Sequence, residues 1–149
     1  MSRLLLYIGR LLIVLVGYLA GCLAASAFLN MLLVGGLDMN AEQMHWTLTG
    51  SVFVSVPILA VFIAYYGFVP AMAWMLLAEF TDKRDWLFHA LGGGVAALAA
   101  VLMFSTPASA GLRLQIALVA SGLVGGIAYW AISGRMAGSW RPEPISPVR

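Results

Sequence analysis

The sequence has very few charged residues. Among its 149 residues there are eight Lys or Arg and six Asp or Glu, so charged residues make up 9% of the chain. Soluble globular domains carry about 25% charged residues. Hydrophobic residues make up 62%, and so little charge cannot cover the surface of a domain in water. This composition excludes an ordinary soluble domain, and a net charge of +2 is too small for a nucleic-acid-binding surface.

Cysteine and histidine are also scarce. A single cysteine, Cys22, excludes an internal disulfide framework and a cysteine-based zinc site. The two histidines, His45 and His89, are predicted to lie near opposite membrane surfaces, too far apart for a shared metal or haem site. No serine or threonine stands in a nucleophile motif. We therefore expect no catalytic residue, no metal, no cofactor and no enzymatic activity, with a lipid-modifying activity at a membrane interface as the alternative. We interpret both histidines as interfacial.

Long apolar stretches dominate the rest of the chain and predict an all-α integral membrane protein with four transmembrane helices. Residues 11–34 contain no charge; as a helix they would span about 36 Å, enough to cross a hydrocarbon core of about 30 Å. The four helices are expected at about residues 11–34, 48–78, 86–104 and 112–132. They form a single domain, residues 1–134, followed by a flexible basic tail, residues 135–149.

The first apolar stretch also resembles a processing signal. Leu19-Ala-Gly-Cys22 matches the lipobox of bacterial lipoproteins, in which Cys22 would be lipidated, and Ala25-Ser-Ala27 resembles a secretory cleavage site. The apolar run continues past both sites, however, whereas a lipoprotein continues into a polar tether. We favour a retained helix and keep lipidation at Cys22 as the alternative, which the intact mass would distinguish.

The second apolar stretch is too long for one perpendicular crossing. Pro57 and Pro70 lie within it, and in a helix they deprive the carbonyls of Phe53 and Tyr66 of their usual partners. The sequence therefore predicts a long, proline-kinked helix. A shorter crossing over residues 48–67, followed by a re-entrant segment, is the alternative.

Basic residues are distributed unequally between the two sides of such a bundle. Four crossings place both termini and the central hairpin on one side. That side receives seven basic residues: Arg3, Arg10, Lys83, Arg84, Arg135, Arg141 and Arg149. The other side receives only Arg113. Because basic residues are retained in cytoplasmic loops, this bias predicts cytoplasmic termini in a bacterial-type inner membrane.

The central hairpin holds five of the fourteen charged side chains: Glu79, Asp82, Lys83, Arg84 and Asp85. One interpretation makes it a docking point for a partner. The other makes it a solvated turn, with a Glu79–Lys83 pair at helical spacing and Asp85 at the start of the next helix. We favour the second interpretation.

Small residues recur at a spacing of four, which lets membrane helices approach closely. The pairs are Gly17 with Gly21 and Gly122 with Gly126, and a further cluster begins at Gly92. For the Gly92 cluster we expect packing within the chain. For the other pairs, packing within the chain and packing between two copies both remain open.

No motif identifies a function. The leading hypothesis is an accessory or interaction subunit that packs against itself or against a larger membrane protein within the lipid bilayer, without nucleic acid. The alternative is a small oligomeric transporter or channel. In that case the kink at Tyr66, Gly67 and Pro70 would line the path.

Overall fold

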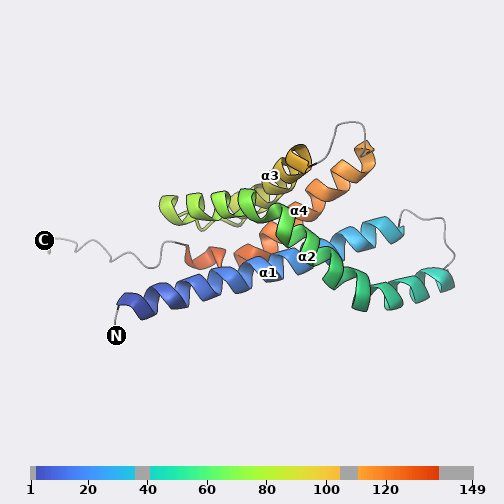
Figure 1. The fold of residues 1–149 in the computed structure, drawn as a ribbon, viewed down its shortest axis with the longest axis horizontal. Coiled ribbons are helices and arrows are strands. Elements are labelled where there is room, and N and C mark those ends of the chain that lie inside the picture. Colours follow the sequence, from blue (N-terminus) through green and yellow to red (C-terminus); the bar gives the residue numbers. More distant parts are fainter. Residues whose placement is uncertain (1–2, 36–40, 105–110, 138–149) are drawn as a thin grey trace, which may run out of the picture.

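The computed structural model describes residues 3–35, 41–104 and 111–137, and these residues are helical apart from short turns (Figure 1). The helices are α1 (Arg3–Gly35), α2 (Ala41–Thr81), α3 (Trp86–Phe104) and α4 (Leu112–Ile132), followed by the short 3-10 helix η1 (Gly134–Met136). Each of α1 to α4 contains a segment long enough and apolar enough to cross a membrane. The structure is therefore that expected of a four-helix membrane protein.

Two helices are longer than the apolar stretches that predict them. α1 begins at Arg3 rather than near residue 11, and α2 begins at Ala41 rather than near residue 48. The reason is that hydropathy marks the part of a helix that suits lipid, whereas helical hydrogen bonding continues as long as no residue interrupts it. Residues 41–81 form one continuous helix that contains both prolines, so the alternative with a re-entrant segment is wrong.

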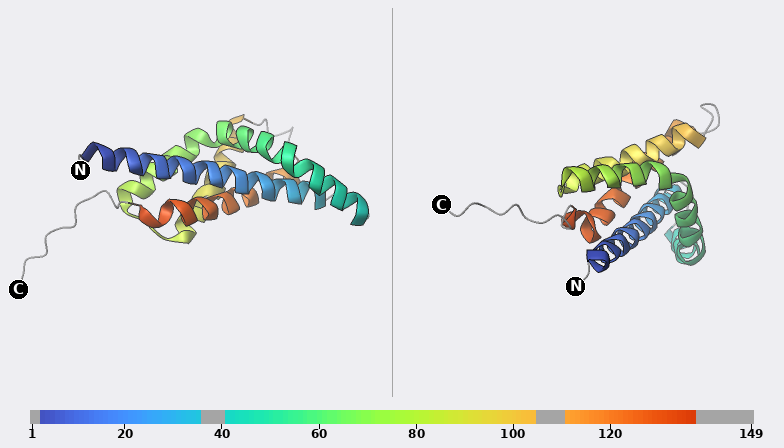
Figure 2. Two further views of the ribbon diagram at one scale, coloured as in Figure 1. Left: turned by 90° about the horizontal axis from the view of Figure 1, so that it is seen from below. Right: turned by 60° about the vertical axis from the view of Figure 1, so that its left-hand side comes forward.

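The four helices form a closed ring in which each packs against two others. α1 contacts α2 and α4, and α3 contacts the same two helices from the opposite side. Figure 2 shows the ribbon of α2 curving along its length as it passes from α1 towards α3. This arrangement places the faces of all four helices around one central space.

The contacts of α4 with its two neighbours depend on glycine. A methyl group added at Gly93 of α3 would collide with the main-chain oxygen of Gly122, and one added at Gly122 would collide with that of Gly93. On the other side of α4, Gly21 and Gly125 lie so close that a Cβ on either would stand 2.9 Å from the other's carbonyl oxygen. The main chains of α1, α3 and α4 therefore approach more closely than side chains would allow.

Hydrogen bonds join α1 to α2 instead. The Ser26 hydroxyl donates to the carbonyl of Val56 at 2.6 Å, and the Asn30 amide donates to the Ser55 hydroxyl at 2.6 Å. Such bonds satisfy polar groups that lipid cannot solvate. They fix the C-terminal half of α1 against the N-terminal half of α2.

The turn between α2 and α3 is a helix stop built on Asp82. Its φ of 52° is left-handed, a conformation that Asp tolerates better than most residues. The amide of Lys83 then donates to the carbonyl of Ala78 at 3.2 Å, as in a Schellman motif. The Asp85 carbonyl accepts the amide of His89 at 3.4 Å, so α3 begins directly after the turn.

Candidate functional site

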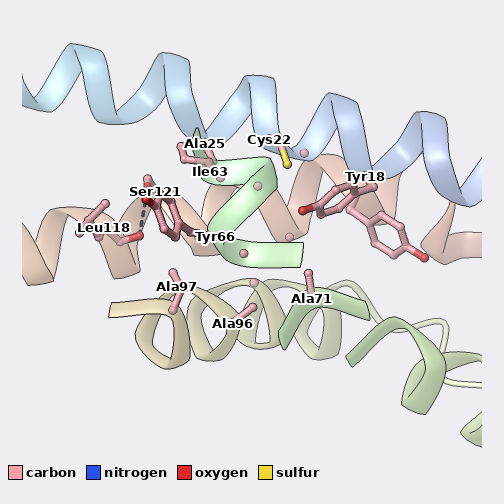
Figure 3. A pocket seen from close by; sticks show the side chains of 18 of the residues that line it. Tyr18, Cys22, Ala25, Ile63, Tyr66, Ala71, Ala96, Ala97, Leu118 and Ser121 are labelled. Atoms are coloured by element: carbon pink, nitrogen blue, oxygen red, sulfur yellow. Dashed lines mark hydrogen bonds between the residues drawn. The ribbon is translucent and has the colours of Figure 1, made fainter. Parts of the chain in front are cut away.

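A cavity of about 520 Å³ lies between the four helices. Figure 3 shows Cys22 and Ala25 of α1, Ala71 of α2 and Ala96 of α3 around it. These are small side chains, and glycines of α3 and α4 also contribute to the wall. Contacts between neighbouring helices hold the four helices in place. The cavity exists because the small residues that face it do not fill the space between these helices.

The cavity wall is uncharged. Among the described residues that line the cavity, none is Asp, Glu, Lys or Arg. Its polar side chains are Tyr18, Cys22, Tyr66, Trp74, His89, Ser121 and Tyr129. An apolar wall with a few polar groups is typical of a site for a small organic ligand.

Most of these polar side chains already bind the main chain. The Tyr18 hydroxyl donates to the carbonyl of Ala64 at 2.6 Å, and the Ser121 hydroxyl donates to that of Leu118 at 2.7 Å. The Trp74 indole N–H donates to the Phe88 carbonyl at 3.2 Å, and the two rings stack with centroids 4.9 Å apart. Each bond satisfies a polar group inside an apolar environment.

An aromatic rim connects the cavity to the outer surface of the bundle. We define it as Phe62 and Tyr66 of α2 with Phe104 of α3. All three line the cavity, yet they are 53%, 40% and 57% exposed. The Tyr66 and Phe104 rings meet edge to face at 4.9 Å, so they form an exposed edge of the cavity.

A charged link holds three helices together at the opposite end. Arg10 of α1 forms an ion pair with Glu79 of α2, and its guanidinium also donates to the Ser133 carbonyl at 3.2 Å. The two charged side chains are only 10% and 16% exposed. Sequence reasoning considered a local Glu79–Lys83 pair and missed this long-range one, although both residues lie at the same end of neighbouring antiparallel helices.

His89 is buried near the start of α3. It is 3% exposed, because its ring packs against Tyr129 with centroids 5.6 Å apart and Gly134 lies over its Nε2 atom. The Nδ1 atom lies 2.9 Å from the Asp85 carbonyl, whereas Nε2 has no hydrogen-bond partner in the described part of the chain. Sequence reasoning did not predict this burial, because it did not predict η1, which covers the side chain.

The central hairpin also packs against the chain's own helices. The Arg84 side chain donates to the carbonyl of Ala137 at 3.0 Å, and the Trp130 indole donates to the carbonyl of Arg84 at 2.7 Å. The Arg135 guanidinium lies 4.6 Å from the centre of the Trp130 ring. Asp82, Lys83 and Asp85 lie on the exposed part of the turn.

The predicted packing glycines all face other helices of the same chain. Gly17 and Gly21 of α1 face α4, while Gly122 and Gly126 of α4 face α3. Gly92 faces the Trp74 indole of α2, which a methyl group would displace. These glycines therefore have partners without a second copy or another protein.

The structure places two of the three predicted kink residues at the cavity. Tyr66 and Gly67 line the cavity, but Pro70 is not among the lining residues. The hydroxyls of α1 donate to the carbonyls of Val56 and Ala64, not to those of Phe53 and Tyr66 that proline leaves open.

The side chain of His45 and the basic tail beyond residue 137 lie outside the described residues. Within the described ranges there is no group of three His, Cys, Asp or Glu side chains that would hold a metal ion.

Fold and cavity together define the class of protein: four helices suited to a membrane, arranged around an uncharged central cavity. No protein-family model, curated protein or solved structure matches the chain.

Proposed function

We propose that the protein binds one lipid-like molecule in the cavity between its four helices. The observation that carries this proposal is the uncharged cavity of about 520 Å³, which connects to the lipid-facing surface at the aromatic rim. This volume lies within the range of about 300–1,000 Å³ found for ligand pockets. An apolar ligand already dissolved in the bilayer would reach the site laterally.

The proportions of the cavity favour a single extended chain. Its lining runs from Tyr18 to Leu29 on α1 and from Leu59 to Met75 on α2, which at 1.5 Å per residue corresponds to about 16 Å and 24 Å. A volume of 520 Å³ over about 20 Å leaves a mean cross-section of about 26 Å². An α-helix is about 10–12 Å wide and does not fit, whereas one hydrocarbon chain does.

The proposed location of the protein is a bacterial-type cytoplasmic membrane, with both termini on the cytoplasmic side. Seven basic residues against one support this orientation. The charged link and the central hairpin then lie at the cytoplasmic end. The curvature of α2 (Figure 2) supports a proline kink that makes room for the cavity.

A transporting activity fits the same site, with Tyr66 and Gly67 beside the path. It would need an exit as well as an entrance.

The interaction-subunit hypothesis is the second candidate function. The exposed tip of the hairpin, Asp82 with Lys83, favours it. The glycine pairs do not add to it, since contacts within the chain already occupy them.

Ligand binding is testable by thermal stability with a matched pair of variants. Ala71 lines the cavity, whereas Ala73 of the same helix is exposed on the outside. Ala71→Trp should fill the cavity, and Ala73→Trp should only add lipid-facing surface.

Hexadecanol serves as a single-chain probe. At one hundred times its Kd, a ligand stabilises the folded state by about 2.7 kcal/mol, so the wild type and Ala73→Trp should gain several degrees in Tm. Ala71→Trp should gain nothing. No gain in the wild type, or an equal gain in all three proteins, would contradict the proposal.

A further inference from the structure

Four of the seven polar side chains that line the cavity already bind main-chain carbonyls, and this restricts what the cavity can bind. Tyr18, Trp74 and Ser121 each donate to a main-chain carbonyl. A hydroxyl that has donated its hydrogen still accepts through its oxygen. Ser121 and Tyr18 therefore offer acceptors, not donors, to a ligand in the cavity.

The histidine adds no donor in its neutral form. Its Nδ1 atom lies 2.9 Å from the Asp85 carbonyl, and a carbonyl oxygen only accepts, so Nδ1 carries the hydrogen. Nε2 then carries a lone pair and no hydrogen, and it is buried under Gly134. The remaining donors of the wall are the buried Tyr129 hydroxyl, the Tyr66 hydroxyl at the exposed aromatic rim and the Cys22 thiol, which is only a weak donor.

None of the described residues that line the cavity offers a positive charge to a negatively charged headgroup. The largely buried Arg10 binds Glu79 and the Ser133 carbonyl and is not among the lining residues. A carboxylate drawn into this wall would be an unpaired charge in an apolar medium, which is strongly unfavourable.

From these observations we propose that the ligand is a neutral long-chain alcohol, fatty or isoprenoid, whose hydroxyl donates to the oxygen of Ser121 or Tyr18. This proposal rests on the proposed lipid-binding function. Fatty-acid anions and acceptor-only lipids such as esters, aldehydes and quinones are disfavoured, because the wall offers them few donors and no cation.

The single cysteine is a built-in probe of the cavity. Cys22 lines it, is buried, and is the only thiol in the chain. Its rate of modification by N-ethylmaleimide can be followed by mass in lipid nanodiscs, with hexadecanol, methyl palmitate or palmitate added at alkaline pH. These probes share one chain length and differ only in their polar end.

Hexadecanol at ten times its Kd should slow the modification of Cys22 about tenfold, while methyl palmitate and palmitate should change it less than about twofold at the same concentration. Equal protection by hexadecanol and either other probe would overturn the choice of an alcohol and leave lipid binding standing. No protection by any probe would overturn both proposals. Equal protection of Cys22 by hexadecanol in the Ala71→Trp and Ala73→Trp variants would place the ligand outside the cavity. That result would also overturn both proposals.

Discussion

Gly126 gives the sharpest test of the packing that encloses the cavity. A methyl group at this position would collide with the carbonyl oxygen of His89 and stand 3.0 Å from the Cα atom of Ala90. Both atoms belong to the main chain of α3, so no side-chain rotation relieves the collision. Gly126→Ala therefore forces α3 and α4 apart.

Gly9 of α1 provides the matched control, because a methyl group there meets nothing within 4 Å. Overpacking of a tight contact costs about 1–3 kcal/mol, whereas Gly→Ala at an open helical site gains about 0.5–1 kcal/mol. We expect Gly126→Ala to destabilise the protein by about 1–3 kcal/mol and Gly9→Ala to stabilise it slightly.

The measurement is unfolding by SDS titration in mixed micelles, followed by tryptophan fluorescence at a protein concentration low enough to keep the chain monomeric. Monomers suffice because Gly126 packs within the chain. Equal stability of the Gly126→Ala and Gly9→Ala variants would refute the close contact. A loss that appears only when the protein is concentrated would instead assign Gly126 to an interface between two copies.

The remaining predictions concern the charged link, the rim and the orientation. Arg10→Gln and Glu79→Gln should each destabilise the protein by about 3 kcal/mol, because each change leaves a buried charge without its counter-ion. The double variant should lose clearly less than the sum of the two single losses. Additive losses in the SDS titration would contradict the ion pair. Tyr66→Ala should raise the rate at which N-ethylmaleimide modifies Cys22, because it opens the rim; an unchanged rate would place the entrance elsewhere. In a Cys22→Ser background, Asn40→Cys should react with an impermeant maleimide added to intact cells, and reaction only after lysis would reverse the proposed orientation.

Hydropathy alone predicts the four helices, because the length and composition of an apolar run determine whether it suits a membrane. It does not predict that α1 begins at Arg3, because polar and basic residues at the membrane surface continue a helix as well as apolar ones do. Nor does it decide between one helix and a helix with a re-entrant segment around Pro57 and Pro70. In the structure the chain remains helical through both prolines.

The candidate site depends on information that a linear pattern lacks. The alanines and glycines of α3 are visible in the sequence, but the same spacing fits either helix packing or the wall of a cavity. Only the arrangement of four helices separates Gly94, which meets Leu123 of α4, from Ala96, which is buried and lines the cavity. The Arg10–Glu79 pair is likewise a product of the tertiary fold, since 69 residues separate its members.

Native mass spectrometry of the protein purified in mild detergent tests lipid binding most directly. The wild type and Ala73→Trp should carry one neutral lipid per 15.9 kDa chain, and Ala71→Trp should appear as the bare chain. A wild-type chain that is always bare, or the same bound lipid on all three proteins, would contradict a ligand in the central cavity.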